Sequence, residues 1–135
     1  MDNIVYEDYM PFNGYKRVLD GKRWNFINKD EILLSPCMWF DMAYCFSDGF
    51  ARVVWNSKLN YLDTNGKLVS QEWFDFGGDY HNGIALVNKN GKSNAINRNG
   101  ELLLDTWYDG VLPYKDENFL QVCIKGEWQL VEVNI

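Results

Sequence analysis

Short apolar runs, separated by polar tips and glycine turns, recur along the whole chain. The stretch GFARVVWNSKLNYLDTNGKLV, which begins at Gly49, predicts a strand, a polar tip, a second strand, a glycine turn and the start of a third strand. The chain repeats this pattern from Gly83 onward as GIALVNKNGKSNAINRNGELL. No apolar run with helical spacing is longer than two turns, so the sequence predicts no helix.

An aromatic triplet marks the same point of each repeat. Trp39-Phe40-Asp41 recurs at a constant step as Trp73-Phe74-Asp75 and as Trp107-Tyr108-Asp109. One step before the first triplet, Val5-Tyr6-Glu7 is a degraded copy in the same register. Four units of this length account for almost the whole chain. The sequence therefore predicts one domain over residues 1–135, with no segment left for a second one.

Other columns repeat in step with the triplets. An aromatic residue follows each triplet, at Phe12, Phe46, Tyr80 and Tyr114. The first hairpin strand carries Val18, Val53, Val87 and Val122, preceded by Tyr15, Phe50, Ile84 and Phe119. The second carries an amide column, Asn25, Asn60, Asn94 and Gln129, beside Ile27, Leu62, Ile96 and Val131. Gly66 and Gly100 then predict tight turns with positive φ, whereas Asp30 and Glu31 in the first copy predict a different turn.

These patterns predict an all-β fold of four 34-residue units, each a three-stranded antiparallel sheet. A closed, propeller-like toroid is the first expectation, because an open stack leaves an uncovered, aggregation-prone sheet surface at each end and closure removes both. An open, twisted β-solenoid is the alternative. Termini that lie far apart would contradict the ring.

Several short motifs resemble those of the WG repeat family. GKRWNFIN at Gly21 and KGEWQLVE at Lys125 are similar to its lysine-tryptophan-glycine core, and FSDGFARV and YHNGIALV to its opening motif. NGKLV and NGELLL are similar to its middle turn, and WFD to its closing triplet. The family's glycine after tryptophan is replaced by the amide column, and its tryptophan is kept only at Trp24 and Trp128. The resemblance implies a repeat scaffold of bacterial and phage-associated proteins with no shared enzymatic activity.

Charge and hydropathy narrow the choice of partner and location. The net charge of −6 argues against a nucleic-acid partner and suits a partner protein with a basic surface. No apolar run approaches the ~20 residues of a membrane span, so no membrane contact is expected. The opening stretch, MDNIVYEDYM, is acidic and is not a signal peptide. We therefore expect a cytoplasmic protein.

Two recurring polar columns raise the question of chemistry. The acids Glu7, Asp41, Asp75 and Asp109 come once per unit, whereas a catalytic acid is needed once or twice, so we assign them a structural role. By the same argument, we expect Trp39, Trp73 and Trp107 to pack in the core between units. Each asparagine of the amide column lies two positions from a buried-type residue and shares its face. These amides either bond neighbouring backbone and fix register, or converge in a closed ring as a polar-lined site for a small ligand.

Three residues break the repeat. Trp55 stands at a hairpin tip where other copies have Asp20, Lys89 and Ile124, and it either anchors a partner or folds onto a neighbouring unit. His81 is the only histidine and occupies a turn; Arg98 precedes an Asn-Gly turn. The candidate partner- or ligand-binding residues are Trp55, His81, Arg98, Asn25, Asn60, Asn94 and Gln129.

The sequence offers no recognisable set of catalytic residues. No Ser/His/Asp or Cys/His set, P-loop or GxGxxG motif can be placed, so we do not expect an enzyme. With three Cys, one His and no CxxC, we expect no metal and no other cofactor. The predicted function is a non-catalytic binding module, namely a protein-binding inhibitor or immunity-type protein in bacterial or phage conflict. The alternative is a protein that sequesters a small ligand, such as a nucleotide or a sugar.

Overall fold

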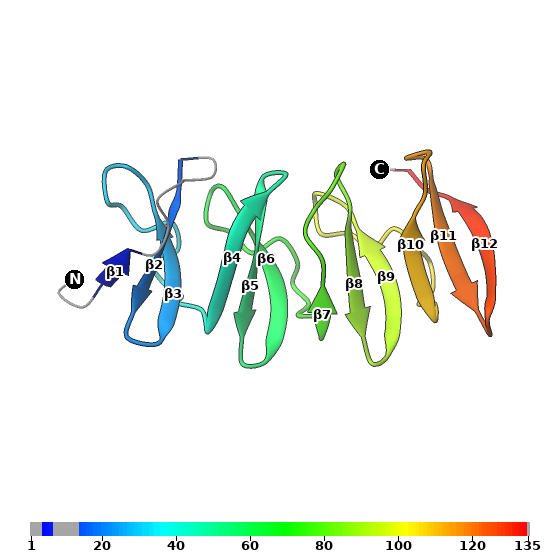
Figure 1. Ribbon diagram of the computed structural model, residues 1–135, viewed down its shortest axis with the longest axis horizontal. Helices are drawn as coiled ribbons and strands as arrows, with labels where there is room; N and C mark the ends of the chain where they lie inside the picture. The colour runs from blue at the N-terminus through cyan, green and yellow to red at the C-terminus, as the bar shows by residue number, and fades with distance from the viewer. Residues whose placement is uncertain (1–3, 7–13, 135) are drawn as a thin grey trace.

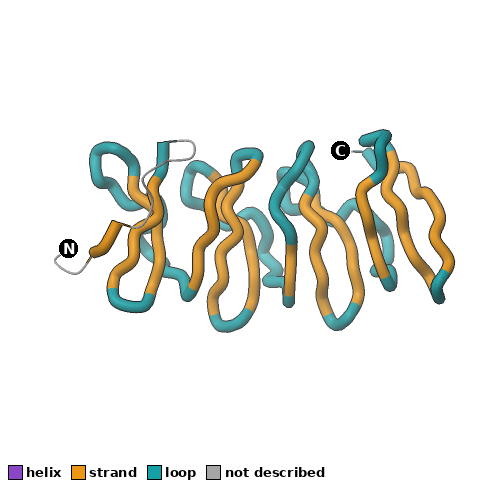
Figure 2. Tube along the Cα trace, viewed as in Figure 1, coloured by secondary structure: helices purple, strands orange, loops and turns teal. Residues whose placement is uncertain are grey.

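The computed structural model describes residues 4–6 and 14–134, with side chains described from residue 14 onward. These residues form four three-stranded antiparallel sheets and contain no helix, as Figure 2 shows. The sheets comprise β1 (Ile4–Tyr6), β2 (Lys16–Asp20) and β3 (Arg23–Ile27); β4 (Met42–Ser47), β5 (Phe50–Trp55) and β6 (Lys58–Asp63); β7 (Phe76–Gly77), β8 (Ala85–Lys89) and β9 (Lys92–Ile96); and β10 (Gly110–Pro113), β11 (Phe119–Ile124) and β12 (Glu127–Glu132). The predicted all-β class and the four three-stranded units are confirmed.

The hairpin tips explain why the second and third strands of the last three units pair in register. At Asn56-Ser57, Asn90-Gly91 and Lys125-Gly126, both tip residues have positive φ, between 51° and 82°. This is the geometry of the two-residue turns whose twist matches that of the flanking strands. The short polar tips predicted from the sequence therefore close the hairpins β5–β6, β8–β9 and β11–β12.

The turn after each hairpin also repeats, and here the expectation for the first copy was wrong. Gly66 and Gly100 have φ of 80° and 77°, and Glu31, at the equivalent place, has φ of 61°. A Cβ on Gly66 would lie 2.0 Å from the carbonyl oxygen of Leu34, and one on Gly100 would lie 2.3 Å from that of Val69. Each of these glycines packs on the loop of the preceding unit. The first copy reaches the same left-handed turn geometry with a side chain, Glu31, in place of the glycine.

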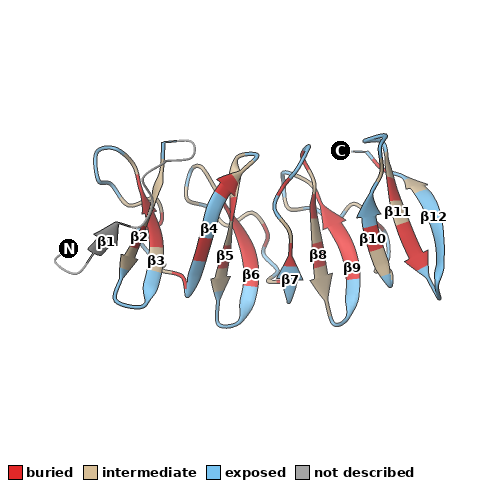
Figure 3. Ribbon diagram, in the orientation of Figure 1, coloured by how far each residue is buried: buried red, intermediate tan, exposed pale blue. Residues whose placement is uncertain are grey.

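The core lies between consecutive sheets. In the first core cluster, Phe26 of β3 packs with Ala43, Ala51 and Val53 of the second sheet. In the next cluster, Leu59 and Tyr61 of β6 pack with the small residues Ala85 and Val87 of β8. The bulky face of one sheet therefore covers the small-residue face of the next, which lets the two surfaces interlock at close range. Figure 3 shows the resulting bands of buried residues on the strands.

The four sheets follow one another in a row along the long axis, with β1 and β12 at opposite ends of the row (Figure 1). No closed barrel is formed by the described residues. Closure would bury the outer face of the last sheet against the first, yet Trp128 and Leu130 of β12 are 50% and 47% exposed. The described residues therefore show a row of sheets without a closed barrel, in which the last sheet keeps an exposed face.

Residues 4–6 and 14–134 contain no helix that is long and apolar enough to cross a membrane.

Candidate functional site

The amide column supports the backbone of each unit. Asn60 is fully buried, and its Nδ2 donates to the carbonyl oxygens of Ser70 (2.9 Å) and Glu72 (3.3 Å). Its Oδ1 accepts from the backbone N–H groups of Tyr61 (2.7 Å) and Ser70 (3.4 Å). Asn25 and Asn94 are also fully buried and make the same four kinds of contact within their own units. Each side chain thus ties its strand to the loop that follows.

These contacts favour the first interpretation of the amide column, in which each amide fixes the local backbone. The amides do not converge, because the units form a row and each amide is used inside its own unit. Gln129, the fourth member, is exposed on β12. No loop equivalent to the one held by Asn60 follows β12 in the described residues.

The acid column caps turns and pairs with lysines. The carboxylate of Asp75 accepts from the backbone N–H of Asn90 (2.8 Å) and from the Nζ of Lys58. The lysine hydrogen bond, and after it the backbone one, holds the pKa of Asp75 below its ordinary value. Asp109 is held in the same way, with its pKa lowered by Lys92 first and then by the N–H of Lys125. The structural role predicted for this column agrees with these contacts; Glu7 lies outside the described residues.

Trp55 is partly exposed and partly packed on a tryptophan of the following triplet. Its side chain is 40% exposed, and its ring centre lies 5.9 Å from that of Trp73 in the following triplet. We expect Trp55→Lys to lower the free energy of unfolding by about 0.5–1.5 kcal/mol, the scale of one aromatic pair. Urea denaturation of the two proteins measures this difference. Unchanged stability would show that the indole contact contributes nothing, and would leave the exposed part of Trp55 as a pure surface feature.

Arg98 has a partner in the second unit. Its Nη2 lies 3.2 Å from Oδ1 of Asp48, whose other oxygen accepts from the backbone N–H of Gly83 at 2.8 Å. The backbone hydrogen bond from Gly83 is the main cause that lowers the pKa of Asp48, and Arg98 adds to it. Arg98 therefore ties the turn of one unit to the loop of another.

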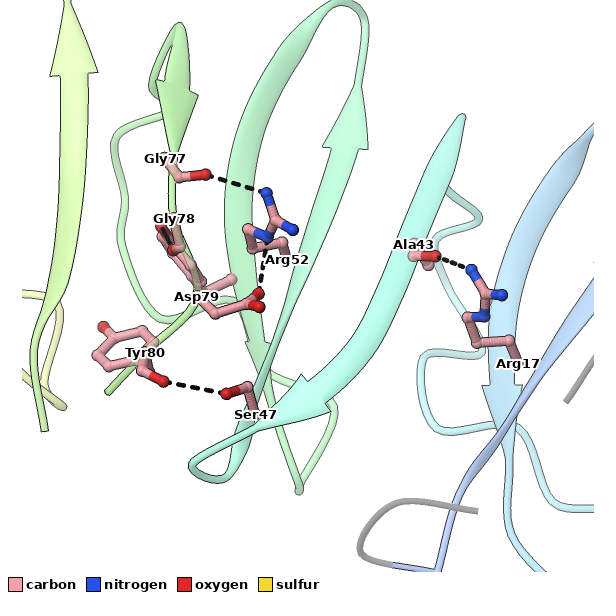
Figure 4. A network of polar contacts seen from close by, with 9 residues as sticks. Arg17, Ala43, Ser47, Arg52, Gly77, Gly78, Asp79 and Tyr80 are labelled. Carbon is pink, nitrogen blue, oxygen red and sulfur yellow. Dashed lines mark hydrogen bonds and ion pairs between the residues drawn. The ribbon is translucent and has the colours of Figure 1, made fainter. Parts of the chain in front are cut away.

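His81 lies where one sheet packs on the next, a contact that we call a joint. It is therefore a candidate predicted from the sequence that lies at a surface between two units. At the equivalent place one unit earlier, Ser47 donates its hydroxyl to the carbonyl oxygen of Tyr80 at 3.1 Å (Figure 4). His81 is exposed, and its backbone bridges to Ile84 across the turn. The described residues hold no group of three or more His, Cys, Asp and Glu side chains placed to bind a metal ion.

The joints between sheets differ in their aromatic contacts. Across the first joint, Tyr15 stacks on Phe46 with ring centres 5.6 Å apart. Across the second, Phe50 stacks on Tyr80 at 4.2 Å. The third joint has Ile84 at the place of Tyr15 and Phe50, so its Tyr114 receives no equivalent ring.

The third joint also lacks the bridging cation of the other two. Nη1 of Arg17 donates to the carbonyl oxygen of Ala43 at 2.8 Å, and that of Arg52 donates to Gly77 at 3.2 Å (Figure 4). Arg52 also binds Asp79 through Nε at 2.7 Å. The equivalent residue at the third joint is Leu86, which cannot reach across by hydrogen bonding.

The third joint also has Ala95 in place of an aromatic residue. This residue stands where the earlier units have Phe26 and Tyr61. Those two rings contact the aromatic residue of the next sheet, each with ring centres 4.9 Å apart. At the joint between the third and fourth sheets, the third unit therefore lacks the two rings and the arginine that its predecessors supply at the first two joints.

A pocket opens at this joint. Its volume is about 180 Å³, close to the ~150 Å³ that holds a benzene ring in an engineered protein cavity. Apolar walls come from Ile84 and Leu86 of the third unit and from Phe119 and Leu120 of the fourth. The remaining lining residues are Gly78, Asp79, His81, Asn82, Pro113, Tyr114 and Glu117. The pocket thus matches one planar ring, with polar groups among its lining residues.

Of the residues predicted from the sequence, this pocket includes His81 alone; Trp55, Arg98 and the amide column lie elsewhere. The sequence contained a signal for it, namely the apolar Ile84, Leu86 and Ala95 in columns where the first two units carry aromatic residues or arginine. That signal has meaning only when the columns are known to face one another across a joint.

Two solved structures are weakly similar to the chain. "KlHsv2 with loop 6CD replaced by a Gly-Ser linker" matches 96% of this chain and 48% of its own, with 10% identity and a TM-score of 0.48. A protein of unknown function from Bacteroides caccae matches 89% of this chain and 57% of its own, with 17% identity and a TM-score of 0.37. The chain thus spans about half the length of these two structures. No match was found among curated proteins.

The sequence comparison with protein families gives a clear result. The model of the WG containing repeat matches three consecutive stretches, residues 25–58, 61–92 and 95–128. These stretches cover most of the chain and include the joint at which the pocket opens. The resemblance noted in the short motifs is thereby confirmed for three repeats, and the chain belongs to the WG containing repeat family.

Proposed function

We propose that the protein is a non-catalytic binding module that holds one planar ring in the pocket between the third and fourth sheets. A single observation supports this site above the others. Two joints carry a ring stacked on Phe46 or Tyr80, and the third presents Tyr114 beside a ring-sized pocket. A bound ring would complete at this joint the contact that the chain itself makes at the other two.

The first candidate for the bound ring is an aromatic side chain of a partner protein. Aromatic residues are frequent anchors at protein interfaces because one ring fills a pocket at a small cost in conformational entropy. The net charge of −6 suits a partner with a basic surface around that anchor. We therefore propose a protein-binding inhibitor or immunity-type protein of bacterial or phage conflict, acting in the cytoplasm.

The second candidate is a small ligand with an aromatic ring, such as a nucleotide base. His81, Asn82 and Glu117 line the pocket and carry hydrogen-bonding groups for polar atoms of such a ligand. A sugar ring is a weaker match, because the walls from Ile84 and Leu86 are apolar.

We also infer that the chain contains four copies of the repeat, arranged as an open solenoid. The support for the fourth copy is that β10, β11 and β12 pair in the same order as the strands of the other units. The support for an open array is the row of sheets in Figure 1 and the exposure of Trp128 on its last sheet.

The variant Ile84→Tyr tests the proposed site, because it supplies the ring that Tyr15 and Phe50 supply elsewhere. We expect it to fill the pocket and raise the free energy of unfolding by about 0.5–1.5 kcal/mol. Thermal shift is measured with indole, phenol, nucleosides and tyrosine-containing peptides as probes. A probe that binds the wild-type protein raises its Tm by mass action, and this rise should disappear in the variant.

Ile84→Val is the matched control, since it keeps the pocket open and should keep the response to the probe. Peptides that outperform indole and nucleosides would identify a protein partner, and the reverse order would identify a small ligand. A response that persists unchanged in Ile84→Tyr would place the binding site elsewhere and refute the pocket.

A further inference from the structure

The last sheet presents an apolar surface that the other sheets keep covered. Trp128 and Leu130 of β12 are 50% and 47% exposed, and β12 is coloured as exposed in Figure 3. At the places equivalent to Leu130, Phe26 and Tyr61 are at most 1% exposed. The same strand position is therefore a core position in the interior units and a surface position at this end of the row.

The first three units show what kind of segment pairs with the edge of the equivalent strand. Two backbone hydrogen bonds join Leu59 of β6 to Phe74 of the following triplet, with N···O distances of 2.7 and 2.8 Å. The same pair of bonds joins Trp24 to Phe40 and Ser93 to Tyr108. Trp128 is the fourth member of this series, and among the described residues β12 pairs with β11 alone. An extended segment can thus add to β12 by the geometry already used three times in the chain.

Charge indicates which segment fits. Beside each interior bridge, a cation on the hairpin strand faces the acid of the triplet: Arg23 faces Asp41 at 3.9 Å, Lys58 contacts Asp75, and Lys92 contacts Asp109. The equivalent residue on β12 is Glu127, which reverses the sign. An acidic triplet is therefore repelled at this end, and a basic residue in its place is attracted.

We infer that the edge of β12 binds an extended segment of a partner protein, with an aromatic residue opposite Trp128 and a Lys or Arg opposite Glu127. A second copy of this chain fits less well. Its own first triplet, Val5-Tyr6-Glu7, would bring Glu7 against Glu127. The surface therefore selects a basic partner and disfavours end-to-end assembly, and it is separate from the pocket at Ile84.

Two peptides taken from the chain itself test this inference. Residues 101–113, ELLLDTWYDGVLP, include the bridge to β9 at Tyr108, and the second peptide carries Asp109→Lys. Labelled at the N-terminus, each is titrated with the full chain by fluorescence anisotropy. We expect the lysine peptide to bind the wild-type chain about two- to fivefold more tightly, the scale of one exposed ion pair. Glu127→Lys should invert this preference.

Trp128→Ser, which installs the residue found at Ser93, should weaken binding of the lysine peptide about tenfold or more. Ile84→Tyr should leave it unchanged, which separates this surface from the pocket. The inference is overturned if neither peptide binds at millimolar concentration, or if residue 127 does not alter the preference. Sedimentation velocity showing a wild-type dimer that Trp128→Ser dissociates would identify a second copy as the occupant and also refute it.

Discussion

Replacing Asn60 by alanine is expected to lower the free energy of unfolding by about 3–5 kcal/mol, because each buried polar group left without a partner costs about 1–3 kcal/mol. The amide is fully buried and holds the carbonyl oxygens of Ser70 and Glu72 and the N–H groups of Tyr61 and Ser70. Because a domain of this size is stable by only about 5–15 kcal/mol, urea denaturation will show a large shift of the midpoint.

Gln129→Ala is the matched control for this experiment. Gln129 occupies the same column but is exposed on β12, so its loss should change stability by no more than about 0.5 kcal/mol. A small effect of Asn60→Ala would contradict the structural role of the column and would return its amides to the list of ligand-binding candidates.

Phe74→Ala is expected to cost about 3–5 kcal/mol, and Trp73→Ala about 1–2 kcal/mol, although the indole is the larger side chain. Phe74 is fully buried in the cluster with Leu59 and Tyr80, so its removal leaves a cavity. Trp73 is half-buried and packs on Trp55, so water can replace part of its contacts. Thermal and urea denaturation of the two variants, measured side by side, give the order.

The burial of the triplet residues confirms only in part an expectation drawn from the sequence, since Trp73 and Trp107 pack against the core clusters without being buried in them. The conspicuous Trp39, Trp73 and Trp107 suggest that tryptophan forms the core between units, but all three are only half-buried. The middle residue of the triplet bridges to the hairpin strand and points inward, as the fully buried Phe40 and Phe74 show. A larger loss of stability in Trp73→Ala than in Phe74→Ala would reverse this assignment.

The sequence was sufficient for the features that are local to one unit. Strands, hairpins and turns depend on residues close together in the chain, such as the Asn90-Gly91 tip. Each motif is weak evidence alone, but its recurrence at a constant step makes the assignment of strands and turns firm. The structural role of the acids followed in the same way, because a residue needed in every unit serves the fold of that unit.

The tertiary structure decided how the units meet. Whether four units close depends on how each unit packs on the next, which no residue column encodes by itself; the described residues form a row of sheets without a closed barrel. The pocket depends on Ile84 and Tyr114, which line it from neighbouring units, and the left-handed turn at Glu31 could not be foreseen from its residue type. The sequence by itself determined the repeating unit, since its contacts are local. The tertiary structure decided which residues that differ from the repeat are functional candidates. The reason is that the contacts concerned join residues of neighbouring units.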